Sequence, residues 1–121
     1  MESIPVALGP ARTLLEHPGL DQVTDILKCK WSFAILEAIS RGVNRPGRLE
    51  RELPGLTTKV LNDRIRKLER YGVIVRHAYP EIPPRVVYEL TDRGRRLVGL
   101  VKVIVDFADE WTQGLLDQRR S

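Results

Sequence analysis

The side chains with the clearest chemical capability lie in the segment TTKVLNDRIRK, residues 57–67. Lysine and arginine can donate hydrogen bonds to guanine, asparagine can pair bidentately with adenine, and a threonine methyl group can contact thymine. If Leu61, Ile65 and Leu68 form the inward face of a helix, the polar residues share its outward face. The segment therefore predicts a surface that reads base edges in DNA, formed by Thr57, Thr58, Lys59, Asn62, Asp63, Arg66 and, at its margin, Lys67.

Asp63 fits this surface less directly than its neighbours do. A carboxylate can accept a hydrogen bond from the amino group of cytosine. We favour a different role, in which Asp63 pairs with Lys59 or Lys67 one helical turn away and orients them. The alternative for the whole set is an ordinary solvated helix face.

A second group of cations lies in RHAYPEIPPRVVYEL, residues 76–90, whose β-forming runs and proline-rich centre predict a hairpin. Arg76, His77 and Arg85 are expected close to a tip stiffened by Pro83 and Pro84. A cation there can reach phosphates or an adjacent minor groove. Arg85 is the preferred wing residue, whereas His77 is expected to pack or to hydrogen-bond within the sheet.

The charges of the chain are segregated. Residues 41–96 hold fourteen Lys and Arg against seven Asp and Glu, whereas the segments on either side are mildly acidic. A basic block of this kind suits a polyanion, because neutralising phosphates releases counterions. Arg45 and Arg48, at the start of a short helix, suit phosphate contacts. The alternative is a solvated surface whose arginine content reflects genome composition.

Periodicity predicts the helices that carry these residues. Apolar positions at helical spacing indicate one helix from Leu20 to a break near Cys29 and a second over 31–39. Pro46 opens a short third helix, and Pro54-Gly55 stops it. Thr57 or Thr58 caps a fourth helix, which ends at Gly72. The third and fourth helices, with their short glycine-containing turn, predict a helix-turn-helix.

Beyond Gly72 the period changes to strand over 73–79 and 86–90, and a long helix follows from Thr91 through Leu116. The predicted fold class is mainly α with a small β-hairpin (α+β), arranged as a winged helix-turn-helix. We assign residues 1–19 to an N-terminal arm, 20–96 to the DNA-binding domain, 91–116 to a dimerisation helix and 117–121 to a tail.

The last helix is apolar on more than one face, which one small domain cannot easily bury. A second subunit would cover the surplus, and a two-fold dimer would bring two reading helices to a pseudo-palindromic DNA site. The alternative is that the N-terminal arm covers this face within one chain. We favour an interface between two copies that uses both segments, with the residues Leu14, Leu15, Leu100, Val101, Ile104, Phe107, Ala108, Trp111 and Leu115.

Composition excludes several other classes. The 121 residues contain one cysteine and two distant histidines, and they lack a glycine-rich phosphate loop and metal-ligand spacing. We therefore expect no enzyme, no bound metal and no cofactor. No apolar run of roughly 18 residues and no secretory signal appears, so we expect a cytoplasmic protein without membrane contact.

Several short motifs follow one another between Leu20 and Trp111. They are Lys30-Trp31, Leu53-Pro54-Gly55, Lys59-Val60-Leu61 with Arg64, Leu68 and Gly72, the 79–85 wing, and Tyr88, Leu90 and Thr91 followed by Gly94. With this combination the chain closely resembles the bacterial HxlR-type regulators of the MarR-like winged helix group. The resemblance implies a homodimeric transcription factor whose terminal helices form the dimer and whose Thr58, Lys59, Asn62 and Arg85 face DNA.

One position departs from the family pattern. Many members carry an oxidant-sensing cysteine just before the first helix, where this chain has His17-Pro18-Gly19. Cys29 is a weaker redox candidate: Lys28 and Lys30 would favour its thiolate, but a small packed residue is the commoner outcome.

Two further questions stay open at this level. A small-molecule effector between the second helix and the last one is conceivable, although nothing polar marks a pocket. The competing function is a winged helix that binds proteins without reading DNA.

Overall fold

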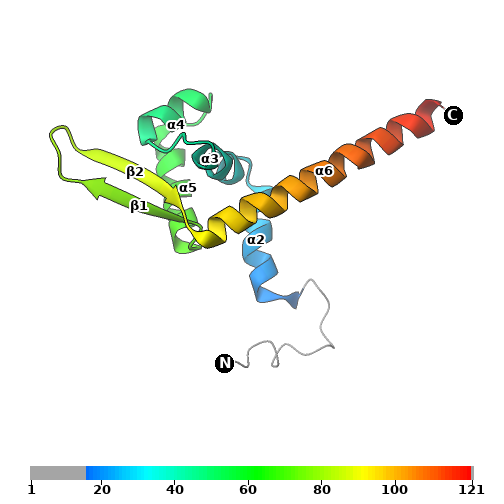
Figure 1. The fold of residues 1–121 in the computed structure, drawn as a ribbon, viewed down its shortest axis with the longest axis horizontal. Helices are drawn as coiled ribbons and strands as arrows, with labels where there is room; N and C mark the ends of the chain where they lie inside the picture. The colour runs from blue at the N-terminus through cyan, green and yellow to red at the C-terminus, as the bar shows by residue number, and fades with distance from the viewer. Residues whose placement is uncertain (1–15, 121) are drawn as a thin grey trace.

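The structure, a computed structural model, describes residues 16–120 (Figure 1). Seven elements follow in the order α2 (Pro18–Lys28), α3 (Lys30–Ser40), α4 (Pro46–Glu52), α5 (Thr58–Arg70), β1 (Ile74–Tyr79), β2 (Arg85–Leu90) and α6 (Asp92–Arg120). The predicted fold class, mainly α with a small β-hairpin, is confirmed. Leu14, Leu15 and most of the predicted N-terminal arm lie outside the described residues.

Helices α2 and α6 each have an end that differs from the prediction by two or more residues. Helix α2 begins at Pro18 rather than Leu20, because the His17 side chain caps it: Nδ1 accepts a hydrogen bond from the Gly19 backbone at 3.1 Å. Helix α6 continues to Arg120, so residues 117–120 are helical and not a tail. No proline interrupts that segment, and Gln113 donates a hydrogen bond to Asp117 one turn later at 3.2 Å.

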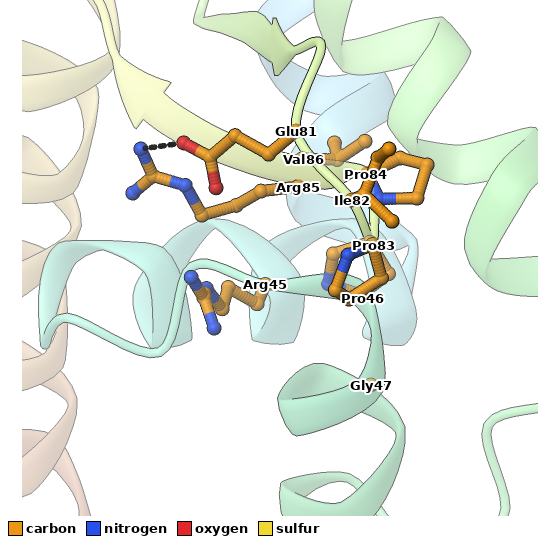
Figure 2. Close-up of a pocket in the computed structure, with 9 residues that line it drawn as sticks. All are labelled: Arg45, Pro46, Gly47, Glu81, Ile82, Pro83, Pro84, Arg85 and Val86. Atoms are coloured by element: carbon orange, nitrogen blue, oxygen red, sulfur yellow. Dashed lines mark hydrogen bonds and ion pairs between the residues drawn. The ribbon is translucent and has the colours of Figure 1, made fainter.

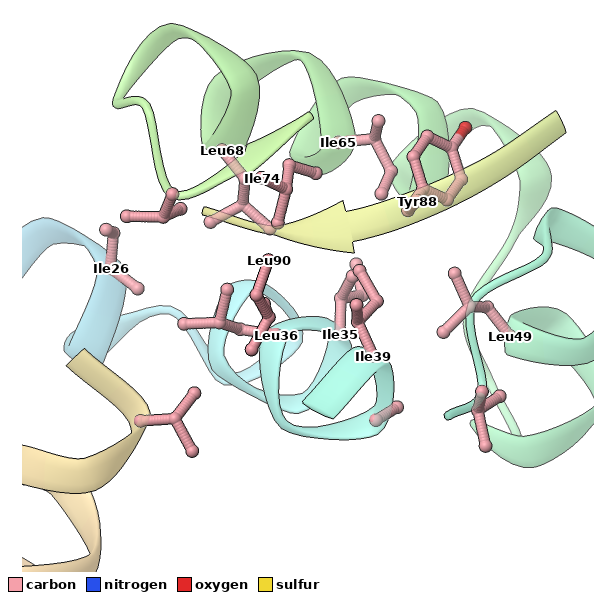
Figure 3. Packing of buried hydrophobic residues seen from close by; sticks show 14 of the residues in the cluster. Ile26, Ile35, Leu36, Ile39, Leu49, Ile65, Leu68, Ile74, Tyr88 and Leu90 are labelled. Atoms are coloured by element: carbon pink, nitrogen blue, oxygen red, sulfur yellow. The ribbon is translucent and has the colours of Figure 1, made fainter. Parts of the chain in front are cut away.

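Helix α3 is the centre of the core. It packs against α2, α5, β2 and α6, and its Ile35, Leu36 and Ala38 are completely buried (Figure 3). Leu49 of α4 and Leu61 of α5 are buried against the same cluster. This packing fixes the helix-turn-helix to the rest of the domain, because burying each of the leucine and isoleucine side chains stabilises the arrangement by about 1.5–3 kcal/mol.

The start of α6 is locked to the turn that follows α5. The Thr91 hydroxyl donates a hydrogen bond to the Gly72 carbonyl at 2.6 Å and accepts one from the Gly94 backbone at 3.1 Å. Gly94 lies so close to this turn that an added Cβ would stand 2.1 Å from the Val73 carbonyl oxygen. Contacts among Gly72, Val73, Thr91 and Gly94 therefore hold the end of α5, the base of the hairpin and the start of α6 together.

The second half of α6 leaves the body of the protein (Figure 1). Every residue from Lys102 to Arg119 is exposed, including Phe107 and Trp111, whose exposed fractions are 59% and 63%. Val101 was predicted at an interface between subunits, but it is buried in the core of its own chain, as is Val98. The inward face of α6 is thus formed by Leu97, Val98 and Val101. None of the helices among residues 16–120 is long and apolar enough to cross a membrane.

Candidate nucleic-acid interface

Helices α4 and α5 form the predicted helix-turn-helix. Gly55 in their connection has a φ of +91°, a left-handed conformation that other residues adopt only with strain. The two helices are also tied by a side-chain contact, in which the Thr58 hydroxyl donates a hydrogen bond to the Glu50 carboxylate at 2.8 Å. The angle of α5 to α4 is therefore fixed by the turn, by buried leucines and by this hydrogen bond.

Helix α5 shows the two faces that its sequence predicts. Leu61, Ile65 and Leu68 are buried, and the Thr57 hydroxyl caps the helix by accepting a hydrogen bond from the Val60 backbone at 3.2 Å. The structure gathers the polar side chains on the exposed face, where Thr58, Lys59, Asn62, Asp63 and Arg66 all contact solvent. This face is open to solvent and has the residue types that hydrogen-bond to base edges.

The expected partners of Asp63 were wrong. Its carboxylate lies 3.8 Å from the Arg66 guanidinium, one turn later on α5, and not beside Lys59 or Lys67. Both side chains are more than half exposed, so the pair is weakly held. Asp63 therefore lies beside Arg66, but the contact does little to fix the Arg66 side chain.

Lys67 is turned away from the exposed face of α5. Its Nζ lies 2.8 Å from Oδ2 of Asp25 on α2, and the Tyr71 hydroxyl donates a hydrogen bond of 2.5 Å to the same oxygen. The hydrogen bond from Lys67, followed by that from Tyr71, lowers the pKa of Asp25, while the contact with Asp25 raises the pKa of Lys67. Nothing in residues 57–67 signalled Asp25, because this partner lies more than forty positions earlier in the chain.

The wing is an antiparallel hairpin in which Tyr79 and Arg85 form the last pair before the tip. The Arg85 guanidinium lies 4.1 Å from the centre of the Tyr79 ring and donates a hydrogen bond of 3.0 Å to Glu81. Its Nε has no hydrogen-bond partner within residues 16–120. Arg85 is therefore at the tip, as predicted, but Glu81 holds it within the wing. Sequence reasoning missed Glu81, because a spacing of four residues indicates a side-chain contact on a helix and not at the tip of a hairpin.

An open cleft of about 400 Å³ separates the wing tip from the start of α4 (Figure 2). Arg45 and Arg85 both line it, and their guanidinium groups point toward the same side in this view. Arg48 is exposed one turn further along α4. The cations predicted to contact phosphates on α4 and on the wing thus lie next to one another.

Arg76 is not at the wing tip, where the sequence placed it. It pairs with Tyr88 in the middle of the hairpin and lines a shallow hollow of about 220 Å³ between the sheet and α5, together with Asn62 and Arg66. Burial raises the pKa of Tyr88, and the nearby Arg76 charge partly opposes this rise. Arg76 therefore lies beside Asn62 and Arg66 of α5 and not beside Arg85 at the wing tip.

His77 makes the contact that was predicted for it. Its Nε2 lies 2.9 Å from the Glu89 carboxylate on the neighbouring strand. The contact stays within the sheet.

Cys29 lies half-buried between α2 and α3. Burial raises the pKa of its thiol. The hydroxyl and backbone N–H of Ser32 and the Arg64 charge lower this pKa by more in total, so it lies below its usual value. Among residues 16–120, no cluster of His, Cys, Asp and Glu is arranged to hold a metal ion.

The exposed half of α6 carries most of the residues predicted to form a dimer. The rings of Phe107 and Trp111 contact each other at an angle of 48° with their centres 6.0 Å apart, and Trp111 and Leu115 line a hollow further along the helix. The remaining exposed members of the predicted set are Leu100, Ile104 and Ala108.

Comparison with known proteins matches this architecture. Residues 26–115 match the HxlR-like helix-turn-helix family. The HTH-type transcriptional regulator sll1512 of Synechocystis is 42% identical over 94 residues, which cover 78% of this chain and 70% of the relative. YvaP of Bacillus subtilis, of the same description, is 36% identical over 78% of this chain and 87% of its own length.

Solved structures agree with these relatives. A MarR-family transcriptional regulator from Enterococcus faecalis superposes with a TM-score of 0.74 at 30% identity, covering 87% of this chain and 96% of that one. The reduced form of YodB from B. subtilis gives a TM-score of 0.71 at 26% identity, covering 78% of this chain and 92% of YodB. The fold is thus shared with solved transcriptional regulators, and the chain belongs to the HxlR-like helix-turn-helix family, whose members are transcriptional regulators and not enzymes.

Proposed function

We propose that this regulator binds double-stranded DNA sequence-specifically as a homodimer, with α5 in the major groove. The observation that carries the proposal is the exposed face of α5, on which Lys59, Asn62 and Arg66 are open to solvent. In helix-turn-helix proteins the N-terminal part of the second helix meets the base edges. Asn62 would then pair with an adenine, and Lys59 or Arg66 with a guanine.

The wing and the start of α4 would hold the DNA backbone. Arg45 and Arg85 line one cleft, and Arg48 is exposed nearby, so a phosphate strand or the edge of a minor groove could lie along all three. These contacts carry little sequence information but fix the position of α5 on the duplex. The DNA surface would therefore divide into a reading helix and a clamping edge.

The second copy would pack on the exposed half of α6. This helix leaves Ile104, Phe107, Trp111 and Leu115 in solvent, each at least 44% exposed, which is unusual for large apolar side chains that lie together. A two-fold dimer would present two copies of α5 to half-sites about one helical turn apart, which implies a pseudo-palindromic operator. We also expect the protein in the cytoplasm, where a transcriptional regulator would meet its DNA target. A small-molecule effector stays a prediction.

The first test is selection of duplexes from a random library with the purified protein, followed by binding isotherms at several salt concentrations. We expect affinity to fall steeply with salt, with a slope set by the number of phosphates contacted. Arg85→Ala should weaken binding to selected and scrambled duplexes alike, whereas Asn62→Ala should relax the preference at one base position. A protein-interaction module would give no selected duplex and no salt-dependent binding, and that result would refute the proposal.

A further inference from the structure

Asp25 of α2 contacts Lys67 and Tyr71 at the C-terminal end of α5, and these three residues are not part of the DNA surface proposed above. We propose that Asp25 is a positioning residue for DNA readout: through Lys67 and Tyr71 it fixes the angle at which α5 meets the major groove. The inference rests on the proposed function and assigns to Lys67 a role other than the DNA contact predicted from the sequence.

Both partners converge on one atom of Asp25. Lys67 Nζ and the Tyr71 hydroxyl lie 2.8 Å and 2.5 Å from Oδ2, and Lys67 and Tyr71 are one helical turn apart at the end of α5. The side chains of Lys67 and Asp25 are only 29% and 27% exposed. A charge-assisted pair shielded to this extent holds its geometry better than the exposed pair between Asp63 and Arg66.

Because of its location, the Asp25 cluster can change the orientation of α5 and thereby the position of Asn62, which is proposed to contact a base. Helices α2 and α5 each pack on α3, and the Asp25 cluster joins them directly at the end of α5 that is distant from the DNA. Asn62 lies five residues before Lys67, about 7.5 Å along the helix axis. Bidentate base contacts tolerate only a few tenths of an ångström, so a small tilt of α5 would disturb them while phosphate contacts by long arginines persist.

Lys67 is poorly placed to serve as a phosphate contact. Its ammonium group is held at Asp25 on the α2 side, so a phosphate would have to compete with a carboxylate already at 2.8 Å. Lys59 has no such partner among residues 16–120 and is exposed on the outward face of α5. The two lysines of this helix therefore differ in function, one reading or clamping DNA and the other orienting the helix.

The test compares Asp25→Asn, Tyr71→Phe, Lys67→Met and Lys59→Met with the wild-type protein on a selected duplex and a scrambled one. Asp21→Asn, one turn earlier on α2, is the matched control, because it removes the same charge from an exposed side chain. Tyr71→Phe removes only one hydroxyl and guards against simple unfolding. All variants are checked by circular dichroism and measured well below their unfolding temperatures.

We expect Asp25→Asn and Tyr71→Phe to weaken binding to the selected duplex by about three- to thirtyfold and to the scrambled duplex much less. The salt slope should be unchanged in both variants and in Lys67→Met, whereas Lys59→Met should reduce it by about one if Lys59 meets a phosphate. Asp21→Asn should behave as wild type. Together these results would support the inference.

Two outcomes would overturn it while leaving the proposed function intact. One is wild-type selectivity in both Asp25→Asn and Tyr71→Phe. The other is a salt slope reduced by about one in Lys67→Met, which would make Lys67 a direct phosphate contact. If the wild-type protein binds no duplex at all, the proposed function fails first and this inference fails with it.

Discussion

If Arg85 contacts a DNA phosphate as proposed, Glu81 competes with the DNA for this arginine, and removing the Glu81 charge should tighten binding. In the free protein Arg85 donates a hydrogen bond of 3.0 Å to Glu81, and the two side chains are 38% and 52% exposed. A phosphate that takes Arg85 must displace this carboxylate or accept its negative charge nearby. Glu81→Gln removes the charge while keeping the size of the side chain, so Arg85 becomes available without loss of packing.

The size of the effect follows from the exposure of the pair. Partly exposed ion pairs contribute roughly 0.2–1 kcal/mol, so releasing this one should tighten binding by up to about fivefold. The gain should be similar on selected and scrambled duplexes, because a phosphate contact is independent of sequence. Fluorescence anisotropy with a labelled duplex at low and moderate salt would measure it.

The control is another arginine–glutamate pair with the same spacing and the same nitrogen–oxygen distance, at the end of helix α3. Arg41 and Glu37 are also four residues apart with 3.0 Å between nitrogen and oxygen, and they are 50% and 41% exposed. Glu37→Gln lies outside the proposed DNA surface and should leave affinity unchanged. In an Arg85→Ala background, Glu81→Gln should lose most of its benefit. If Glu81→Gln binds no tighter than wild type, or if its gain persists without Arg85, the competition argument is wrong.

Three further results are expected. Gly94→Ala should destabilise the fold by about 1–3 kcal/mol or more in thermal unfolding, because its Cβ would meet the Val73 carbonyl oxygen at 2.1 Å. Gly99→Ala is the control and should not destabilise the fold, because the space around Gly99 is open. Equal melting temperatures of the two variants would contradict the packing argument. Trp111→Ala should raise the monomer fraction in light scattering at micromolar concentration, and an unchanged mass would count against the α6 interface. The pKa of Asp25 is lowered in the fold, so its stabilisation is present above the ordinary value of 3.8 and is lost as the pH falls through the lower folded value; Asp25→Asn should therefore be less stable than wild type near pH 6 in chemical denaturation but not near pH 2, and a stability gap independent of pH would refute this linkage.

The predictions were most accurate where the helical repeat of apolar residues alone determines which side of an element is buried. Leu61, Ile65 and Leu68 fix the inward side of α5, so the outward side follows from helical geometry alone. The caps and turn glycines were equally local, as the Thr57 cap and the left-handed Gly72 show. Local signals of this kind need no knowledge of which element packs on which.

The errors arose where a side chain could choose between distant partners. Lys67 could serve the outward face or a neighbouring helix, and only the packing of α2 near α5 places Asp25 within its reach. Helix α6 is apolar on two sides, so the sequence could not tell that Val101 faces the core while Leu100, one residue earlier, faces solvent. Arg76 was predicted close to the tip because the strand register, which pairs it with Tyr88, cannot be deduced from the hairpin sequence alone.

Helix α6 runs unbroken from its cap at Thr91 to Arg120, so its rotational phase is transmitted from the buried end to the exposed one. Inserting one residue after Val101 would turn the apolar half by about 100° while leaving the core-facing half in place. In the proposed dimer such a turn would swing the two copies of α5 out of register with the helical repeat of DNA. The permitted distance between operator half-sites would then be encoded in this uninterrupted helix, far from every residue that touches a base.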